Sequence, residues 1–184
     1  MTRKTNSSGL KSSLNKVTKV HYAYAGLLAL QVIIYDAAKL ITPEAVLKRW
    51  QVIAGLVVVT TVVWYLAKAR LAHEYGYRVL TLVLVLADIA IASAYVYEQR
   101  GMASRAVLLY VIAIATVAIL RSRSALFATA ALSVAAYTTT AVTYFVVNFN
   151  EGYKVELYGE ISFYSAIFFV IASLIWASIR PTQK

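Results

Sequence analysis

One carboxylate lies deep inside an apolar segment, and its position is the strongest chemical signal in the chain. Asp88 is at the middle of the segment 78–97, where it is the only internal charge. A charged side chain at the centre of a membrane helix costs about 2.5–3.5 kcal/mol on insertion scales, so it must face the bundle interior and find partners. Two roles fit Asp88. It is a ligand contact, proton-responsive switch or helix–helix latch, or it is a hydrogen-bonded carboxyl that only specifies packing.

A second polar group lies near the end of the first apolar segment. Asp36 and Lys39 are three residues apart, a spacing that places both side chains on one face of a helix, where they can pair. One arrangement is an interfacial ion pair whose Lys39 extends toward water. The other is an outward-facing polar pocket shared with Gln31 and Asp88.

The remaining reactive residue types do not form a catalytic or metal-binding pattern. The chain has no cysteine, which excludes disulfides, thiolate catalysis and cysteine metal sites. His73 precedes Glu74, but the next residues do not continue a phosphoacceptor-histidine pattern, and the two histidines lack metal-ligand spacing. The hydroxyls of residues 138–140 and 143 have no histidine base near them in sequence. We therefore expect no enzyme activity, no cofactor and no metal.

Apolar segments recur along the chain and must position these residues. Hydrophobic residues make up 61% of the chain and charged residues 14%, whereas about a quarter of a soluble domain is charged. A helix needs about 20 residues to cross about 30 Å of hydrocarbon. The sequence predicts an all-α, polytopic membrane domain over residues 21–180, a bundle of about six transmembrane helices. The predicted spans are 21–41, 50–67, 78–97, 104–120, 124–148 and 160–179. Tyr110 and Tyr137 lie deep in their spans and are expected to face other helices.

The lysines and arginines predict the orientation of these spans. With six crossings, one side of the membrane receives twelve of the 18 basic residues and the other side receives six. The larger set lies in both terminal segments and in the links after the second and fourth spans. The positive-inside rule then places both termini in the cytoplasm (N-in/C-in) of a multi-pass protein, in a bacterial inner or plasma membrane. The net charge of +10 is explained by this excess of basic residues on the cytoplasmic side, where they face anionic lipids. No nucleic-acid partner is expected.

The terminal segments are short and flank the membrane domain. Residues 181–184 are predicted to form a cytoplasmic tail. Residues 1–20 are predicted to form a basic cytoplasmic tail. Within the longer tail, apolar residues recur at helical spacing with lysines between them: Leu10, Leu14, Val17 and Val20, with Lys11, Lys16 and Lys19. This pattern fits a short interfacial amphipathic helix. The polar run 6–9 fits a disordered tether equally well.

From the third span onward, the residues follow a recognisable order. Ala87-Asp88-Ile89 is followed by Val96-Tyr97, then Gly101 and Ser104, Leu108-Leu109-Tyr110-Val111-Ile112, and Arg121-Ser122-Arg123-Ser124-Ala125-Leu126. This order resembles the six-helix membrane input domain of bacterial sensor histidine kinases, of the type related to pilus-regulating sensors. The resemblance covers residues 78–145 best and implies a family turn at Tyr97, Gly101 and Ser104. This chain has one glycine there, where the family has two.

The resemblance implies a membrane-embedded sensory or regulatory input module of signal transduction. The kinase portion of that family is not found in the 184 residues, so the chain is expected to be a detached input domain or a standalone relative, and kinase activity is not carried over. Two alternatives stay open: a small transporter or substrate-binding transport subunit, and a structural subunit of a membrane complex. The expected partners are the lipid bilayer and a membrane or cytoplasmic protein, with a homodimer as one option.

Overall fold

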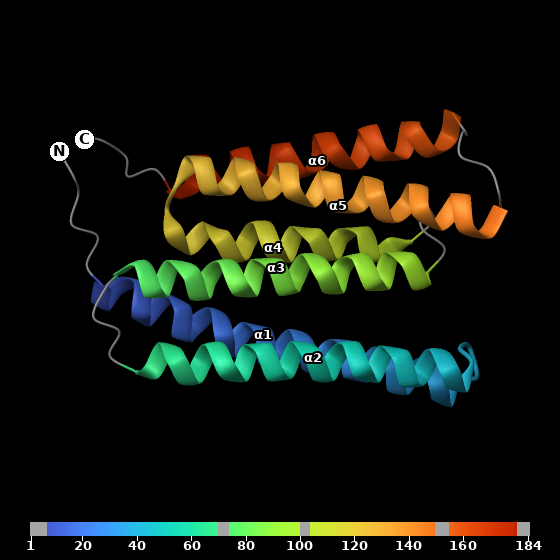
Figure 1. Cartoon of the computed structure of the whole chain (residues 1–184), viewed down its shortest axis with the longest axis horizontal. Coiled ribbons are helices and arrows are strands. Elements are labelled where there is room, and N and C mark those ends of the chain that lie inside the picture. The colour runs from blue at the N-terminus through green and yellow to red at the C-terminus, as the bar shows by residue number, and fades with distance from the viewer. Residues whose placement is uncertain (1–6, 70–73, 100–103, 150–154, 180–184) are drawn as a thin grey trace. The chain divides into compact units, whose positions relative to one another are not determined.

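Every regular element of the computed structural model is helical. The structure describes residues 7–69, 74–99, 104–149 and 155–179. The long helices are α1 (Ser7–Ala37), α2 (Pro43–Lys68), α3 (Glu74–Glu98), α5 (Arg123–Phe149) and α6 (Val155–Ile179) (Figure 1). Between α3 and α5 lie the 3₁₀ helix η2 (Arg105–Leu109), α4 (Tyr110–Val117) and the 3₁₀ helix η3 (Ala118–Leu120). The predicted all-α fold is confirmed. The five long helices are also long and apolar enough to cross a membrane, which indicates a membrane protein.

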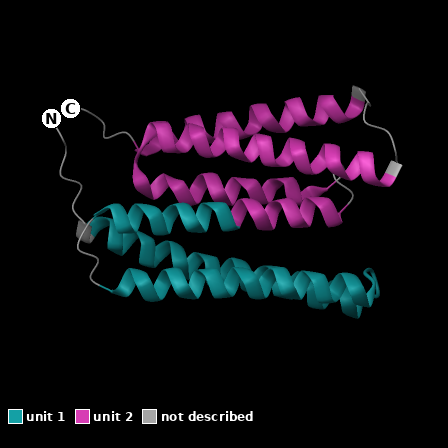
Figure 2. Cartoon of the chain, viewed as in Figure 1, with its two compact units in different colours: residues 1–87 teal, residues 88–184 magenta. Residues whose placement is uncertain are grey.

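The chain divides into two compact units (Figure 2). Unit 1 is residues 1–87 and unit 2 is residues 88–184. The boundary falls inside α3, immediately before Asp88. Unit 1 therefore contains the α1–α2 pair and the first part of α3, and unit 2 contains the rest of α3 with α4, α5 and α6.

In unit 1, α1 and α2 pack as an antiparallel pair (Figure 1). Each helix buries side chains at alternating intervals of four and three residues, the spacing of a left-handed helix pair. In α1 the buried series is Leu14, Thr18, His21, Ala25, Leu28 and Val32. In α2 it is Arg49, Ile53, Leu56, Thr60, Val63 and Ala67.

The predicted basic tail and the first predicted span are one continuous helix. α1 begins at Ser7 and ends at Ala37, so the helix starts earlier than the predicted span 21–41 and stops before its end. Leu14 and Thr18 are fully buried, because one side of the tail packs inside the protein. The tail is helical from Ser7, and its position at the membrane interface stays a prediction.

A tight reversal connects α1 to α2. Lys39 adopts a left-handed backbone with φ 55°, and the N–H of Leu40 donates to the Tyr35 carbonyl at 2.8 Å, which closes the end of α1. Thr42 then caps α2 because its Oγ1 accepts from the N–H of Ala45 at 3.3 Å, and Pro43 opens the helix.

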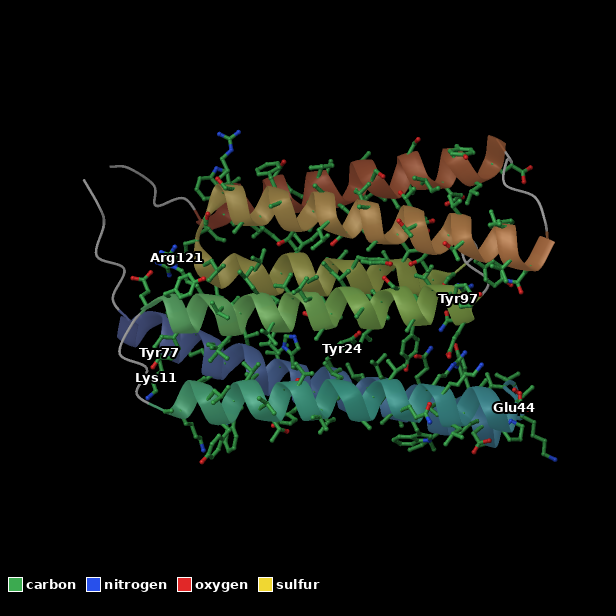
Figure 3. All side chains as sticks on the ribbon, in the orientation of Figure 1. Lys11, Tyr24, Glu44, Tyr77, Tyr97 and Arg121 are labelled. Atoms are coloured by element: carbon green, nitrogen blue, oxygen red, sulfur yellow. The ribbon has the colours of Figure 1, made fainter. Side chains whose placement is uncertain are left out.

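The opposite end of α2 is capped by side chains from its neighbours. The Nζ of Lys11 donates to the carbonyl of Lys68 at 3.0 Å, and the Oη of Tyr77 donates to the carbonyl of Ala69 at 3.3 Å; both side chains are labelled in Figure 3. A helix C-terminus leaves carbonyls without helical partners, and a cation there also interacts favourably with the negative end of the helix dipole. The first turns of α1 and of α3 therefore stabilise the end of α2.

The fourth predicted span is short, and its 3₁₀ turns lengthen it. Arg105–Leu120 is the shorter apolar helix of the chain, and η2 and η3 supply 5 and 3 of its residues. A 3₁₀ helix rises about 2.0 Å per residue against about 1.5 Å in an α-helix, so the segment reaches about 28 Å instead of about 24 Å. That length is close to the hydrocarbon thickness of about 30 Å. Arg121, with φ 49°, ends the segment in a left-handed conformation.

Candidate functional site

Asp88 is buried in unit 2, as predicted. Its side chain is 1% exposed, and its Oδ2 accepts a hydrogen bond from the Oγ1 of Thr116 at 2.9 Å. Thr116 is on α4 and is also buried. The carboxyl of α3 is therefore bonded directly to the adjacent short helix. This contact supplies the hydrogen-bond partner that a buried carboxyl requires.

A second, partly buried contact joins the same two helices. The hydroxyl of Ser93 donates to the Ile89 carbonyl at 2.8 Å, and Ser93 Oγ lies 2.8 Å from the Oη of Tyr110. Because the serine proton is already used, the phenol of Tyr110 donates to Ser93. This contact is a second polar link between α4 and α3.

We call Asp88, Thr116, Ser93 and Tyr110 the polar latch. The two bonded residues of α3 are five positions apart in sequence, and their two partners on α4 are six positions apart. Bonds at two levels fix the axial position and the rotation of α4 against the second part of α3. In hydrocarbon, where water does not compete, such bonds are worth about 0.6–1.7 kcal/mol each.

Aromatic rings continue from the polar latch to the last two helices. The ring centroid of Tyr110 lies 6.1 Å from that of Tyr137 on α5 and 5.7 Å from that of Phe168 on α6. Tyr137 in turn lies 5.7 Å from Tyr164 on α6, edge to face. These separations are favourable for ring pairs. Tyr110 and Tyr137, both fully buried, face other helices as predicted.

The predicted family turn is only partly described. Tyr97 is 38% exposed and packs edge to face on Tyr144 at 5.6 Å (Figure 3). Ser104 caps η2: its Oγ accepts from the N–H of Ala106 at 3.0 Å and donates to Gln99 Oε1 at 3.3 Å. Gly101 lies outside the described residues. Ser104 therefore has a local structural role at the start of the fourth span.

Asp36 and Lys39 are both exposed, and the helical spacing predicted for them is wrong. α1 ends at Ala37, and Lys39 has already left the helix with φ 55°. Gln31 is partly buried, five residues before Asp36. All three belong to unit 1, whereas Asp88 opens unit 2. The polar pocket shared among the four residues stays a prediction.

Two residues were missed by the sequence interpretation. Thr116 gave no signal, because a threonine in an apolar helix commonly bonds its own backbone. Arg49 was counted as a basic residue outside the membrane, yet it is 5% exposed and its guanidinium carbon lies 5.7 Å from the Tyr35 ring centroid. Its position inside the first turns of α2 was the available signal.

The site offers hydrogen bonding and packing. Among the residues that the structure describes, no group of three or more His, Cys, Asp or Glu side chains is placed to hold a metal ion. No protein-family model matches the chain, and neither a curated protein nor a solved structure resembles it at a significant level.

Proposed function

We propose that this chain is a membrane-embedded sensory or regulatory module with six crossings and both termini in the cytoplasm. Five helices have the required length and apolarity, and the stretched Arg105–Leu120 segment provides the sixth crossing. The bias of twelve basic residues against six supports the orientation. The resemblance of residues 78–145 to a sensor input domain supports the class of function.

The observation that carries the proposal is the polar latch of unit 2. A signalling module needs an element with two arrangements and a stimulus that favours one of them. The bond from Thr116 to Asp88 is such a contact, because a proton or a polar ligand that reaches the carboxyl competes with the threonine. Loss of this bond would leave Ser93 and Tyr110 as the remaining described contact of the latch between α3 and α4.

The short fourth span supplies a second arrangement. Conversion of η2 and η3 to α-helix would shorten the segment by about 4 Å. Because η3 ends at the left-handed Arg121 and α5 begins at Arg123, the shortening would move the start of α5. The Tyr110 ring contacts would carry the same displacement to α5 and α6.

Helix continuity favours this function over transport. Transport sites are usually built where membrane helices are interrupted near the bilayer midplane. Here α1, α2, α3, α5 and α6 are each continuous over 25 to 31 residues. The 3₁₀ segments lie at the two ends of α4.

Co-purification from native membranes tests the proposal. The wild-type chain is expected to retain a fixed partner, and Asp88→Asn and Thr116→Val are expected to change the recovered amount while inserting normally. Thr60→Val, which alters a buried hydroxyl of unit 1, is the matched control. The sensory assignment fails if both latch variants retain the partner as the wild type does.

A further inference from the structure

One face of α1 is exposed along most of its length. Its residues are also spaced by four and three: Lys16, Val20, Ala23, Leu27, Leu30 and Ile34. This series is offset by two residues from the buried series that starts at Leu14, which places it about 200° around the helix. We call it the exposed stripe. Leu27 is 67% exposed and Leu30 is 52% exposed, so the described part of the chain leaves this face open.

The exposed stripe is basic before Val20 and apolar after it. Toward the start of α1 it carries Lys16, with the exposed Lys19 beside it, and beyond Val20 it is apolar. From Val20 to Leu30 the helix rises about 15 Å. That distance is half of the hydrocarbon thickness of about 30 Å, or one leaflet. A single anionic phospholipid has a charged headgroup and acyl chains about one leaflet long. The basic end of the stripe matches the headgroup, and its apolar part matches an acyl chain.

The two lysines are free to bind an anion. No acidic residue occurs between Met1 and Tyr35, and in the described part of the chain no acidic side chain pairs with Lys16 or Lys19. Two other described basic groups at this end of unit 1 are engaged. Lys11 caps α2, and Arg78 pairs with Glu74 at 2.7 Å.

We propose that the exposed stripe binds an anionic phospholipid, with its phosphate at Lys16 and Lys19 and an acyl chain along Val20, Leu27 and Leu30. Charge favours a lipid over a second copy of α1, because a parallel pair would bring Lys16 and Lys19 against their own copies with no acidic residue to offset them. The inference is independent of the sensory function.

Competition between two lipids tests this proposal. The full chain in a neutral detergent is incubated with equal amounts of phosphatidylglycerol and phosphatidylcholine, and the bound lipid is quantified by native mass spectrometry. A surface lysine contributes about 1 kcal/mol toward an anionic membrane lipid, so a preference of at least about fivefold for phosphatidylglycerol is expected. The double variant Lys16→Gln/Lys19→Gln is expected to bind both lipids equally.

Matched variants separate the alternatives. Lys39→Gln/Lys48→Gln removes two exposed lysines at the other end of the same hairpin and is expected to keep the preference. Circular dichroism checks that each variant remains helical. Equal binding by the wild type, or an unchanged preference in Lys16→Gln/Lys19→Gln, overturns the proposal. Loss of the preference in millimolar inorganic phosphate would assign the lysines to a free anion instead. Because the chain has no cysteine, a disulfide-linked dimer of Leu27→Cys in native membranes would assign the stripe to a second copy.

Discussion

Tyr22 bonds Thr61 at exposed positions of the α1–α2 pair in unit 1, whereas Thr116 bonds Asp88 in the buried interior of unit 2. The buried hydroxyl of Thr60 in α2 has no hydrogen-bond partner among the described residues. The two described contacts therefore differ in their surroundings. The contact across α1 and α2 lies at exposed positions, and the contact across α3 and α4 is buried.

This difference matters in a membrane. Lipid tails are as apolar as leucine, so apolar contact alone gives helices little reason to prefer one another over lipid. Close packing of regularly spaced side chains can hold α1 to α2 without fixing a polar register. The polar latch joins α4 to α3, and we propose that its opening is the regulated step. Unit 2 is therefore the region in which we expect a regulated change.

The largest expected effect is at the ring that joins the latch to α5 and α6. Tyr110→Ala removes a fully buried ring and is expected to lower the free energy of unfolding by about 3–5 kcal/mol, as other large aromatic truncations do. Unfolding by sodium dodecyl sulfate in mixed micelles measures this change. Tyr110→Phe keeps the ring and is the control. Equal losses for the two variants would show that the ring contacts are unimportant.

A smaller effect is expected at the buried carboxyl. Thr116→Val removes the donor to Asp88 without changing the shape of the side chain, and the expected loss is about 1 kcal/mol. Thr60→Val removes a buried hydroxyl that has no described partner and is expected to be neutral or stabilising. The same unfolding titration compares them. If Thr60→Val were the more damaging variant, the contrast between the units would be reversed.

The second latch bond is expected to contribute about 0.6 kcal/mol. Ser93→Ala removes the bond from Tyr110, whereas Ser165→Ala removes only a bond to the carbonyl of Ile161 within α6. A double-mutant cycle of Ser93→Ala with Tyr110→Phe isolates the coupling energy. No measurable coupling would mean that the contact does not hold the helices together.

The smallest effect is expected at the exposed bond of unit 1. Tyr22→Phe removes the hydrogen bond to Thr61 at 2.8 Å, and the expected change in unfolding free energy is within about 0.5 kcal/mol. A loss as large as that of Thr116→Val would show that unit 1 also depends on polar contacts.

Hydropathy predicted the positions of the helices well where apolar runs are bounded by charges. The span predicted at 78–97 is α3 (Glu74–Glu98), and the span at 124–148 is α5 (Arg123–Phe149). α1 was different. Its lysines predicted the start of the first span, but the helix itself begins earlier and includes Leu14 and Thr18. The end at Ala37 was missed because a left-handed lysine has no sequence signature of the kind that glycine provides.

The sequence predicted one residue of the polar latch and did not predict its partner. An acidic residue among apolar ones must be buried, so Asp88 could be identified alone. Its partner Thr116 is 28 residues away and on another helix, and only the packing of α3 against α4 brings the two together. The 3₁₀ turns around α4 were equally hidden, because the sequence between Arg105 and Arg121 has no charge, glycine or proline to mark them.

Cysteine accessibility on the two sides of Arg105–Leu120 tests the central claim most directly. Because the chain has no cysteine, single Met102→Cys and Ser122→Cys variants can be labelled in sealed cells with a membrane-impermeant maleimide. Six crossings predict that Met102→Cys reacts from outside and that Ser122→Cys reacts only after the membrane is opened. Labelling of both variants from the same side would show that this segment does not cross, and the predicted topology would be wrong.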